Sequence, residues 1–322
     1  MQDEEQQELE GVNMGYQHAL VTGGAGFIGS HIAEMLLAKD IKVTVLDNLS
    51  VGKRENVPDG AYFAEGDINN FKLARALAQE CDIIFHEAAR VTIRASVDKC
   101  YEDAQTNLMG TLNMIRACEK SKVKKFVFAS SMAVYSDSPI AKPVDESFEK
   151  EPLSPYGISK LAAEKYVHLL CRLNHIDSIV LRYFNTFGPR QTFTPYVGVI
   201  TIFINKLLKS ERPVIFGDGN QLRDFVYVGD IAQANILAME SNTSGITVNI
   251  GTGIPTSVNQ VAKLLIERIN PTITPDFGPA RTEELKISFP DISLAKKLIG
   301  YEPQYRLEDK IEEVIAHIKG NA

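Results

Sequence analysis

The octapeptide Thr22-Gly23-Gly24-Ala25-Gly26-Phe27-Ile28-Gly29 carries glycines at positions 23, 26 and 29, in the spacing G-x-x-G-x-x-G. The apolar run at residues 18–21 before it is typical of a buried strand, and Ile32 and Leu36 after it share one helix face. A glycine-rich loop between a strand and a helix is how α/β sheets hold the phosphates of a dinucleotide. The segment therefore predicts a nucleotide-binding α/β fold.

The residues of this loop have separate predicted tasks. Gly23 allows a tight turn, Gly26 lets the backbone approach a pyrophosphate, and Gly29 lets the helix pack closely on the sheet. Phe27 and Ile28 lie at the start of the helix, where free N–H groups and the positive end of the dipole favour phosphate. We therefore expect all five residues to contact the cofactor.

Asp47 ends the second predicted strand, residues 42–46, where the dinucleotide fingerprint places an acidic residue about 20 positions after the loop. Its carboxylate is expected to bond the adenosine ribose, with Asn48 beside it. The same charge repels a 2′-phosphate, which favours NAD over NADP. Lys53 and Arg54 could neutralise such a phosphate, but a solvated loop is the simpler interpretation of both.

The next two strands add further predicted cofactor contacts. Asp67 and Ile68 follow the third strand and could flank the adenine, although Asp67 could equally be a simple turn carboxylate. Ala88 and Ala89 follow the fourth strand, residues 82–85, and are small enough to let the cofactor cross the sheet edge.

Apolar strands alternate with amphipathic helices from Gln17 to Arg182, which predicts an α/β fold with a doubly wound parallel sheet (Rossmann) covered by helices on both faces. Beyond Arg182, loops rich in glycine and proline interrupt the pattern, and we expect a smaller, interleaved substrate-binding domain. The sheet domain is predicted at residues 16–182 and 224–251, the smaller domain at 183–223 and 252–322, and a flexible extension at 1–15. The later predicted strands are 125–129, 178–181, 224–228 and 247–250, and the predicted helices include 71–79, 101–119, 156–173, 202–208 and 258–269.

Tyr156 and Lys160 are four residues apart in a segment predicted to become helical after Pro155, so their side chains share one face. A phenol has a reference pKa of about 10, and a neighbouring ammonium lowers that pKa. Ser131, after the predicted strand 125–129, can hold a substrate hydroxyl against the phenolate. Tyr-x-x-x-Lys alone is usually a solvated pair, but the upstream glycine loop favours a proton-transfer site.

The composition excludes several classes of function. The chain has 322 residues and a net charge of −7, which argues against nucleic acid as the main partner. No apolar run reaches membrane-spanning length, and the acidic N-terminus does not read as a signal peptide. The four cysteines, Cys81, Cys100, Cys118 and Cys171, have no metal-ligand spacing, so we expect no metal and read them as buried free thiols in the cytoplasm.

The sequence resembles the extended short-chain dehydrogenase/reductase superfamily and, within it, the UDP-glucose 4-epimerase family. The resemblance covers nearly the whole chain from about Tyr16, on these motifs: GGAGFIG, DNLS, GDI, HEAA, NLMGT, SSMAVY, SPYGISK, RYFNTFGPRQ, GDGNQLRDFVYV, NIGTG and DISLAKKLIGYEP. It implies bound NAD, a UDP-sugar substrate and a homodimer formed through the helices 101–119 and 156–173.

The resemblance also assigns catalytic roles. Tyr156 would be the acid/base, Lys160 would orient the nicotinamide ribose and lower the pKa of Tyr156, and Ser131 would bond the sugar 4-hydroxyl. Asn107 would lie behind Lys160 as a structural and proton-relay residue, and Phe184 would back the nicotinamide.

Met132 and Ala133 distinguish this chain from relatives with other chemistry. Nucleotide-sugar 4,6-dehydratases carry an Asp-Glu pair at these two positions, and related decarboxylases have a Glu there. Without a carboxylate, the second acid/base step lacks its agent, so oxidation at C4 and return of the hydride remain. This favours a 4-epimerase, an isomerase, of UDP-hexoses.

The substrate contacts implied by the resemblance lie late in the chain. Asn185, Arg223 and Arg281 would bind the diphosphate, a task suited to the planar guanidinium fork; Arg190 is a third candidate cation or a surface residue. Glu284 stands where the family usually has Asp against the uridine ribose.

Ser288 stands where epimerases restricted to unacetylated sugars carry a bulky aromatic residue. Its small side chain predicts room for UDP-GlcNAc and UDP-GalNAc besides UDP-Glc and UDP-Gal.

Two alternatives remain open: another nucleotide-sugar enzyme of the same superfamily, such as a UDP-uronate 4-epimerase or a reductase, and a non-catalytic NAD-binding regulator.

Overall fold

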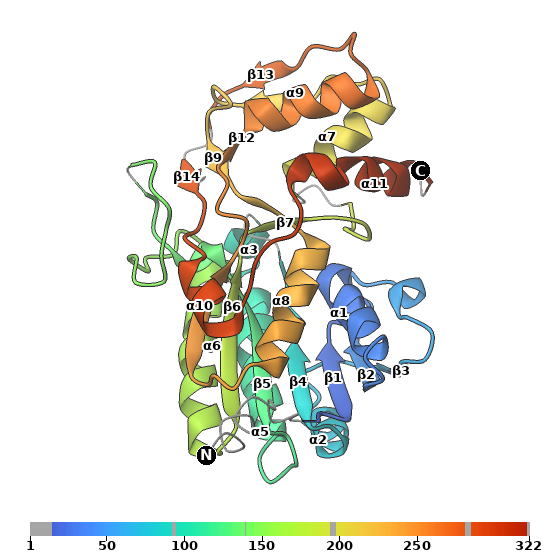
Figure 1. Cartoon of the computed structure of the whole chain (residues 1–322), viewed down its shortest axis with the longest axis vertical. Helices are drawn as coiled ribbons and strands as arrows, with labels where there is room; N and C mark the ends of the chain where they lie inside the picture. Colours follow the sequence, from blue (N-terminus) through green and yellow to red (C-terminus); the bar gives the residue numbers. More distant parts are fainter. Residues whose placement is uncertain (1–14, 92–94, 139, 194–197, 281–284, 321–322) are drawn as a thin grey trace, which may run out of the picture.

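The central element of the protein is a seven-stranded sheet in which every pair of neighbouring strands is parallel (Figure 1). The computed structural model describes residues 15–91, 95–138, 140–193, 198–280 and 285–320. The strand order is β3-β2-β1-β4-β5-β6-β11, which confirms the predicted doubly wound sheet. The strands are β1 (His18–Thr22), β2 (Lys42–Asp47), β3 (Tyr62–Glu65), β4 (Ile83–His86), β5 (Lys125–Ser131), β6 (Asp177–Tyr183) and β11 (Ile246–Ile250).

Helices cover both faces of this sheet and bury its apolar side chains. One apolar cluster joins the sheet to α1 (Phe27–Leu37), α8 (Val228–Glu240) and α10 (Ser293–Ile299). A second cluster joins the opposite face to α2 (Phe71–Glu80), α5 (Thr111–Ala117) and α6 (Pro155–Leu173). Burial on both faces explains why the strands read as nearly continuous apolar runs.

The segment predicted as one helix at 101–119 is helical but irregular. It consists of α4 (Cys100–Ala104), a π-helical stretch at Gln105–Gly110 and α5. A π-helical stretch widens the turn and often marks a functional position; here it contains Asn107.

Helix α6 begins at Pro155 itself, with Ser154 capping the backbone N–H of Gly157. Proline is favoured at the first helical position, so the expectation that it would exclude helix before Tyr156 is wrong.

The smaller part of the molecule has its own apolar cluster, formed mainly by α7 (Val199–Leu208), α9 (Val258–Ile269) and α11 (Leu307–Gly320). Its short strands are β7 (Asn185–Phe187), β8 (Val214–Phe216), β9 (Leu222–Arg223), β10 (Phe225–Tyr227), β12 (Thr256–Ser257), β13 (Asp276–Gly278) and β14 (Ile287–Ser288). Residues 224–228 were expected at the edge of the main sheet, but β10 pairs with β7 in a separate two-stranded sheet.

Three further observations concern helix α10, the N-terminal residues and membrane-spanning helices. Helix α10 packs against β11 and α8 of the sheet, although the sequence placed it in the smaller domain. The predicted extension at 1–15 lies, except for Gly15, outside the described residues. Within the described ranges, no helix is both long and apolar enough to cross a membrane.

Candidate active site

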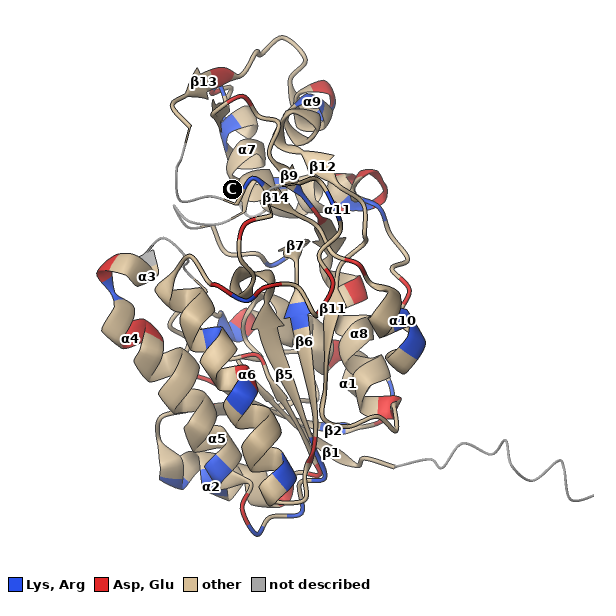
Figure 2. Ribbon diagram, turned by 90° about the vertical axis from the view of Figure 1, so that its left-hand side faces the viewer, with Lys and Arg blue, Asp and Glu red and all other residues tan. Residues whose placement is uncertain are grey.

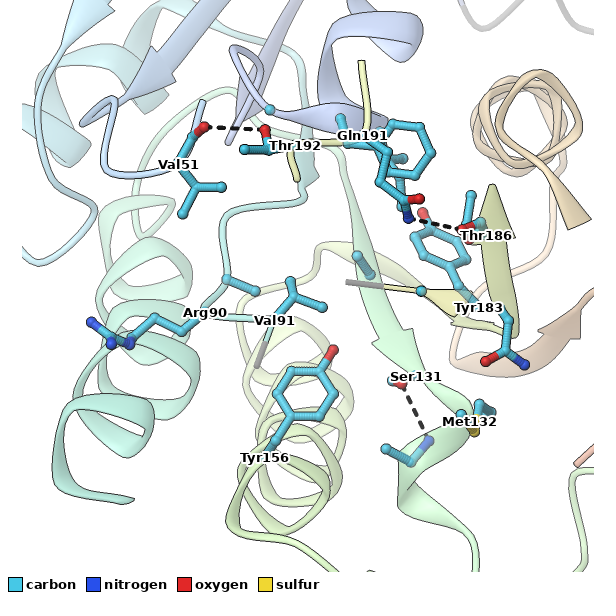
Figure 3. Close-up of a pocket in the computed structure, with 18 of the residues that line it drawn as sticks. Val51, Arg90, Val91, Ser131, Met132, Tyr156, Tyr183, Thr186, Gln191 and Thr192 are labelled. Carbon is cyan, nitrogen blue, oxygen red and sulfur yellow. Dashed lines mark hydrogen bonds between the residues drawn. The ribbon is translucent and has the colours of Figure 1, made fainter. Parts of the chain in front are cut away.

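A cavity of about 1240 Å³ opens at the carboxyl ends of the strands and is lined by residues of both the sheet and the smaller part (Figure 3). Its volume exceeds the range of about 300–1,000 Å³ that is usual for a single small ligand, so it has room for two. The predicted site residues that line it are Gly23, Gly26, Phe27, Ile28, Gly29, Asp47, Asn48, Asp67, Ile68, Ala88, Ala89, Ser131, Tyr156, Lys160, Phe184, Asn185 and Arg223.

The glycine loop is built so that side chains cannot be added to it. Gly23 has a φ of +69°, and a Cβ there would lie 2.8 Å from the backbone nitrogen of Ala88. A Cβ at Gly29 would lie 2.4 Å from the carbonyl oxygen of Gly23. The first turn of α1 therefore packs directly on the loop, and its N-terminus faces the cavity, which is the arrangement that binds a pyrophosphate.

Three polar residues form the wall of the cavity next to this loop. Asp47 accepts hydrogen bonds from the backbone N–H groups of Ala25 (3.0 Å) and Leu49 (2.8 Å), which fixes its carboxylate at the end of β2. Burial raises the pKa of Asp47, and these bonds act in the opposite direction. The amide of Asn48 donates to Asp67 over 2.9 Å. The structure thus brings together Asp47, Asn48 and Asp67, which the sequence placed at the adenosine.

Tyr156, Lys160 and Ser131 line the opposite part of the cavity. Tyr156 and Lys160 lie on α6, and Ser131 lies at the end of β5. The phenol of Tyr156 points into the cavity (Figure 3), and the hydroxyl of Ser131, which accepts from the backbone N–H of Ala133 over 3.2 Å, lines the same cavity. The ammonium of Lys160 donates to the carbonyl oxygen of Ala129 over 2.8 Å. The predicted proton-transfer residues are therefore assembled in one place.

The protein groups alone do not lower the pKa of the phenol, contrary to the expectation for Lys160. Burial raises the pKa of Tyr156, Asp103 and Glu87 raise it further, and the Ser131 hydrogen bond lowers it. Burial also lowers the pKa of Lys160 to about 8, against the raising effect of Glu87 and other carboxylates. Burial is the main cause in both cases, because removal from water disfavours the charged phenolate and the charged ammonium alike.

Asn107 lies behind this site and does not line the cavity. Its amide donates to Asp103 (2.8 Å) and to the carbonyl of Arg90 (3.1 Å), and it accepts from the N–H of Arg90 (2.8 Å). Asp103 in turn accepts from the hydroxyl of Ser159 over 2.6 Å, next to Lys160 in the chain. Asn107 thus joins the π-helical stretch to the loop after β4 and to α6.

The predicted substrate residues are only partly assembled. Asn185 donates to the carbonyl of Asp224 over 3.1 Å, and Arg223 lies on β9 at the cavity wall. Arg281 and Glu284 lie outside the described residues. Ser288 is buried and does not line the cavity in the described part of the chain; its hydroxyl donates to the sulfur of Met132, which does.

Other candidates from the sequence have structural roles here. Arg190 bonds Ser30 (3.1 Å) and pairs with Glu34, so its guanidinium is occupied away from the cavity. His86 has both ring nitrogens bonded, to Thr22 and Thr111. Burial lowers the pKa of His86 to about 3, which keeps the imidazole neutral. Within the described ranges, no group of three or more His, Cys, Asp or Glu side chains could hold a metal ion.

Glu87 and Tyr183 are among the cavity residues that the sequence interpretation missed. Glu87 directly follows β4, and Tyr183 is the last residue of β6. Their position at the carboxyl ends of adjacent parallel strands was the available signal, because ligands bind at that edge of the sheet. The exposed Cys100 also differs from the expectation that all four thiols are buried.

The fold and the site are those of a dinucleotide-dependent α/β enzyme, and Ser131, Tyr156 and Lys160 are the groups predicted for proton transfer that line its cavity. The glycine loop, Asp47 and the paired Asn48 and Asp67 fit the pyrophosphate and adenosine of NAD, because the cradle excludes side chains at the phosphates and offers a carboxylate for the ribose.

Comparison with known proteins supports the same class. Residues 19–251 match the NAD dependent epimerase/dehydratase family. A putative UDP-glucose 4-epimerase of Methanocaldococcus jannaschii is 41% identical over 303 residues, covering 94% of this chain and 98% of the relative. The crystal structure of the UDP-glucose 4-epimerase of Thermotoga maritima with UDP-glucose superposes with a TM-score of 0.91 at 38% identity, covering 95% of this chain and 99% of that one.

A third similar protein is named for a different substrate, an acetylated UDP-sugar. The UDP-N-acetylglucosamine 4-epimerase of Methanobrevibacter ruminantium, in complex with UDP-N-acetylmuramic acid, has a TM-score of 0.90 at 35% identity and covers 95% of this chain and 99% of its own. The chain belongs to the NAD-dependent epimerase/dehydratase family.

Proposed function

We propose that the protein is an NAD-dependent 4-epimerase of UDP-hexoses, an isomerase that interconverts UDP-glucose and UDP-galactose. The observation that carries this proposal is the joint placement of Ser131, Tyr156 and Lys160 in the cavity with Met132 and Ala133 following the serine. The set supplies one acid/base, Tyr156, and the two positions after Ser131 carry no carboxylate, which is sufficient for oxidation and reduction at a single carbon.

The cofactor would be held by the glycine loop, by Asp47 and by the Asn48–Asp67 pair, with Lys160 and Phe184 towards its nicotinamide end. Bound NAD supplies a hydride acceptor and donor for C4 of the sugar, together with a positive charge in the cavity. Because the protein groups raise the pKa of Tyr156, that positive charge is needed for the phenol to act as a base.

Each protein group has one task in the cycle. Ser131 holds the 4-hydroxyl of the sugar, and Tyr156 removes its proton as C4 is oxidised to a ketone. The 4-keto hexose then turns about its phosphate linkage and presents its other face. Tyr156 returns the proton when C4 is reduced. Asn185 and Arg223 hold the diphosphate throughout, so the nucleotide stays bound while the hexose moves.

The test is incubation of the purified protein with UDP-galactose and, separately, with UDP-GalNAc, without added cofactor, and resolution of the products. The proposal expects UDP-glucose in the first reaction and no net consumption of reducing equivalents. In parallel reactions, steady consumption of added NADH would identify a reductase, and conversion of UDP-glucuronate alone would identify a uronate epimerase.

We also propose a homodimer formed through α4, α5 and α6. Figure 2 shows these helices on one flank of the sheet, and α4 and α5 each contact α6. Four large apolar side chains on α6 are exposed at helical spacing, which is typical of an interface. They are Ile158 (58% exposed), Tyr166 (43%), Leu169 (44%) and Leu173 (64%).

The compartment we propose is the cytoplasm. The four cysteines are free, and three of them, Cys81, Cys118 and Cys171, are buried. Unpaired thiols are usual in a reducing compartment.

A further inference from the structure

Glu87 is a carboxyl group in the active-site cavity to which the cycle above assigns no task. It follows β4 and lines the cavity beneath the glycine loop. A Cβ at Gly23 would lie 3.0 Å from the backbone carbonyl carbon of Glu87, so the two segments are in direct contact. Glu87, Tyr156 and Lys160 thus line one cavity, and the backbone of Glu87 touches the cofactor loop.

A chain of hydrogen bonds from Asn235 through Tyr183 holds the carboxyl group of Glu87. The amide of Asn235 donates to the hydroxyl of Tyr183 over 2.7 Å, and that hydroxyl is 2.9 Å from the Glu87 carboxyl. The same amide donates to the carbonyl of Ile231 (2.9 Å), while its own oxygen is buried without a partner. Because Tyr183 accepts from Asn235, its proton is directed at an oxygen of Glu87, which accepts the hydrogen bond.

The electrostatic surroundings of Glu87 are well defined. Burial raises the pKa of Glu87 to about 7, while the Tyr183 hydrogen bond and the Lys160 ammonium act to lower it. The titratable groups on the elements around it are His86 on β4, Asp103 on α4, Tyr156, Lys160 and Glu164 on α6, and Tyr183 on β6. His86 is neutral, and Lys160 is the cation that acts on Glu87.

Glu87 in turn acts on Lys160 and on Tyr156, and it raises the pKa of both groups. Glu87 is the leading charge that raises the pKa of Lys160, and it also raises the pKa of Tyr156. An ionised Glu87 therefore keeps Lys160 protonated and opposes the phenolate. Removal of that charge lowers both pKa values.

We propose that Glu87 is a positioning residue whose carboxylate is the counter-charge of Lys160 and sets the pH range in which Tyr156 serves as the base. The role of Tyr156 in this inference rests on the proposed function. The effect of Glu87 on the ionisation of Tyr156 can be measured without substrate turnover.

The experiment follows the tyrosinate absorbance of the NAD-loaded protein against pH, as the difference from NAD-loaded Tyr156→Phe. Wild type is compared with Glu87→Gln, which keeps the shape of the side chain and removes its charge, and with Glu87→Asp, which keeps the charge. Glu65→Gln is the matched control, because Glu65 is an exposed carboxylate at the end of β3. The pH profile of kcat for UDP-galactose is recorded for the same four proteins.

The expected result is a fall of the Tyr156 midpoint by roughly one pH unit in Glu87→Gln, the size expected when a unit charge within about 10 Å is removed from a protein interior. The wild-type titration is broader, because two interacting groups ionise together. Both limbs of the kcat profile move to lower pH, whereas Glu87→Asp and Glu65→Gln stay near wild type.

A midpoint in Glu87→Gln that equals or exceeds the wild-type value overturns the inference, as does an equal shift in Glu65→Gln. If Glu87→Gln does not retain NAD through purification, the titration is repeated with NAD added in excess, and the Tyr156 midpoint must still fall. Failure of UDP-galactose turnover with the predicted midpoint shift would contradict the proposed function and leave the role of Glu87 intact.

Discussion

The hydroxyl of Ser288 donates a hydrogen bond to the sulfur of Met132 across 3.2 Å. Ser288 is 3% exposed, whereas Met132 lines the cavity one residue after Ser131. The small side chain at position 288 therefore does not itself provide free space beside the sugar, because Met132 fills the volume next to it.

This relationship moves the expected determinant of sugar specificity from Ser288 to Met132. Replacement of Met132 by Ala opens space towards Ser288, so we expect the kcat/KM ratio of UDP-GalNAc to UDP-galactose to rise about tenfold, within the range for changes of pocket size. Ser288→Ala removes the hydroxyl with little change in volume and should leave that ratio near wild type. An equal rise in both variants would contradict the assignment.

The Tyr156 hydroxyl is expected to carry the acid/base step. Tyr156→Phe should lower kcat for UDP-galactose by about 10²–10⁴-fold, the usual contribution of a general base, and should leave NAD bound. Tyr166→Phe, on the exposed side of the same helix, is the matched control. Unchanged turnover in Tyr156→Phe would refute the proton-transfer site.

The buried pair of Glu164 and Arg182 is expected to hold α6 against the sheet. Arg182 donates two hydrogen bonds to Glu164, of 2.7 and 2.9 Å, and both side chains are almost fully buried. Glu164→Gln leaves the guanidinium without its counter-charge, so we expect a loss of about 3–5 kcal/mol in the free energy of unfolding. Urea denaturation measures the loss.

The control for this pair is the exposed ion pair of Lys39 and Glu240, with an N–O distance of 2.8 Å. Glu240→Gln should cost at most about 1 kcal/mol, because exposed pairs are screened by water. Equal losses in the two variants would show that burial does not determine the strength of the Glu164–Arg182 interaction.

The exposed apolar face of α6 is expected to form the dimer interface. Leu173→Glu combined with Leu169→Glu places two charges on that face, so the molar mass measured by light scattering after gel filtration should fall by half. Phe277→Glu changes a residue of similar exposure, 62%, on β13 in the smaller part and should not alter the mass. A wild-type protein that is already monomeric would refute the interface.

The sequence determined the class of fold and most of the cofactor cradle. Both are properties of local pattern: the glycine spacing at 23, 26 and 29 is confined to one turn, and each strand reads as apolar because both faces of the sheet are covered. Residues that end a parallel strand, such as Asp47 and Ser131, could be placed because such ends converge on one edge.

Only the tertiary structure decided what surrounds the catalytic groups. The hydrogen bonds of Ser288 to Met132, of Ser159 to Asp103 and of Tyr183 to Glu87 join elements far apart in the chain. The pKa of a buried group depends on such neighbours and on the loss of water, neither of which is written in local spacing. The sequence therefore predicts Tyr156 as the base, whereas the pH at which it could act depends on the fold.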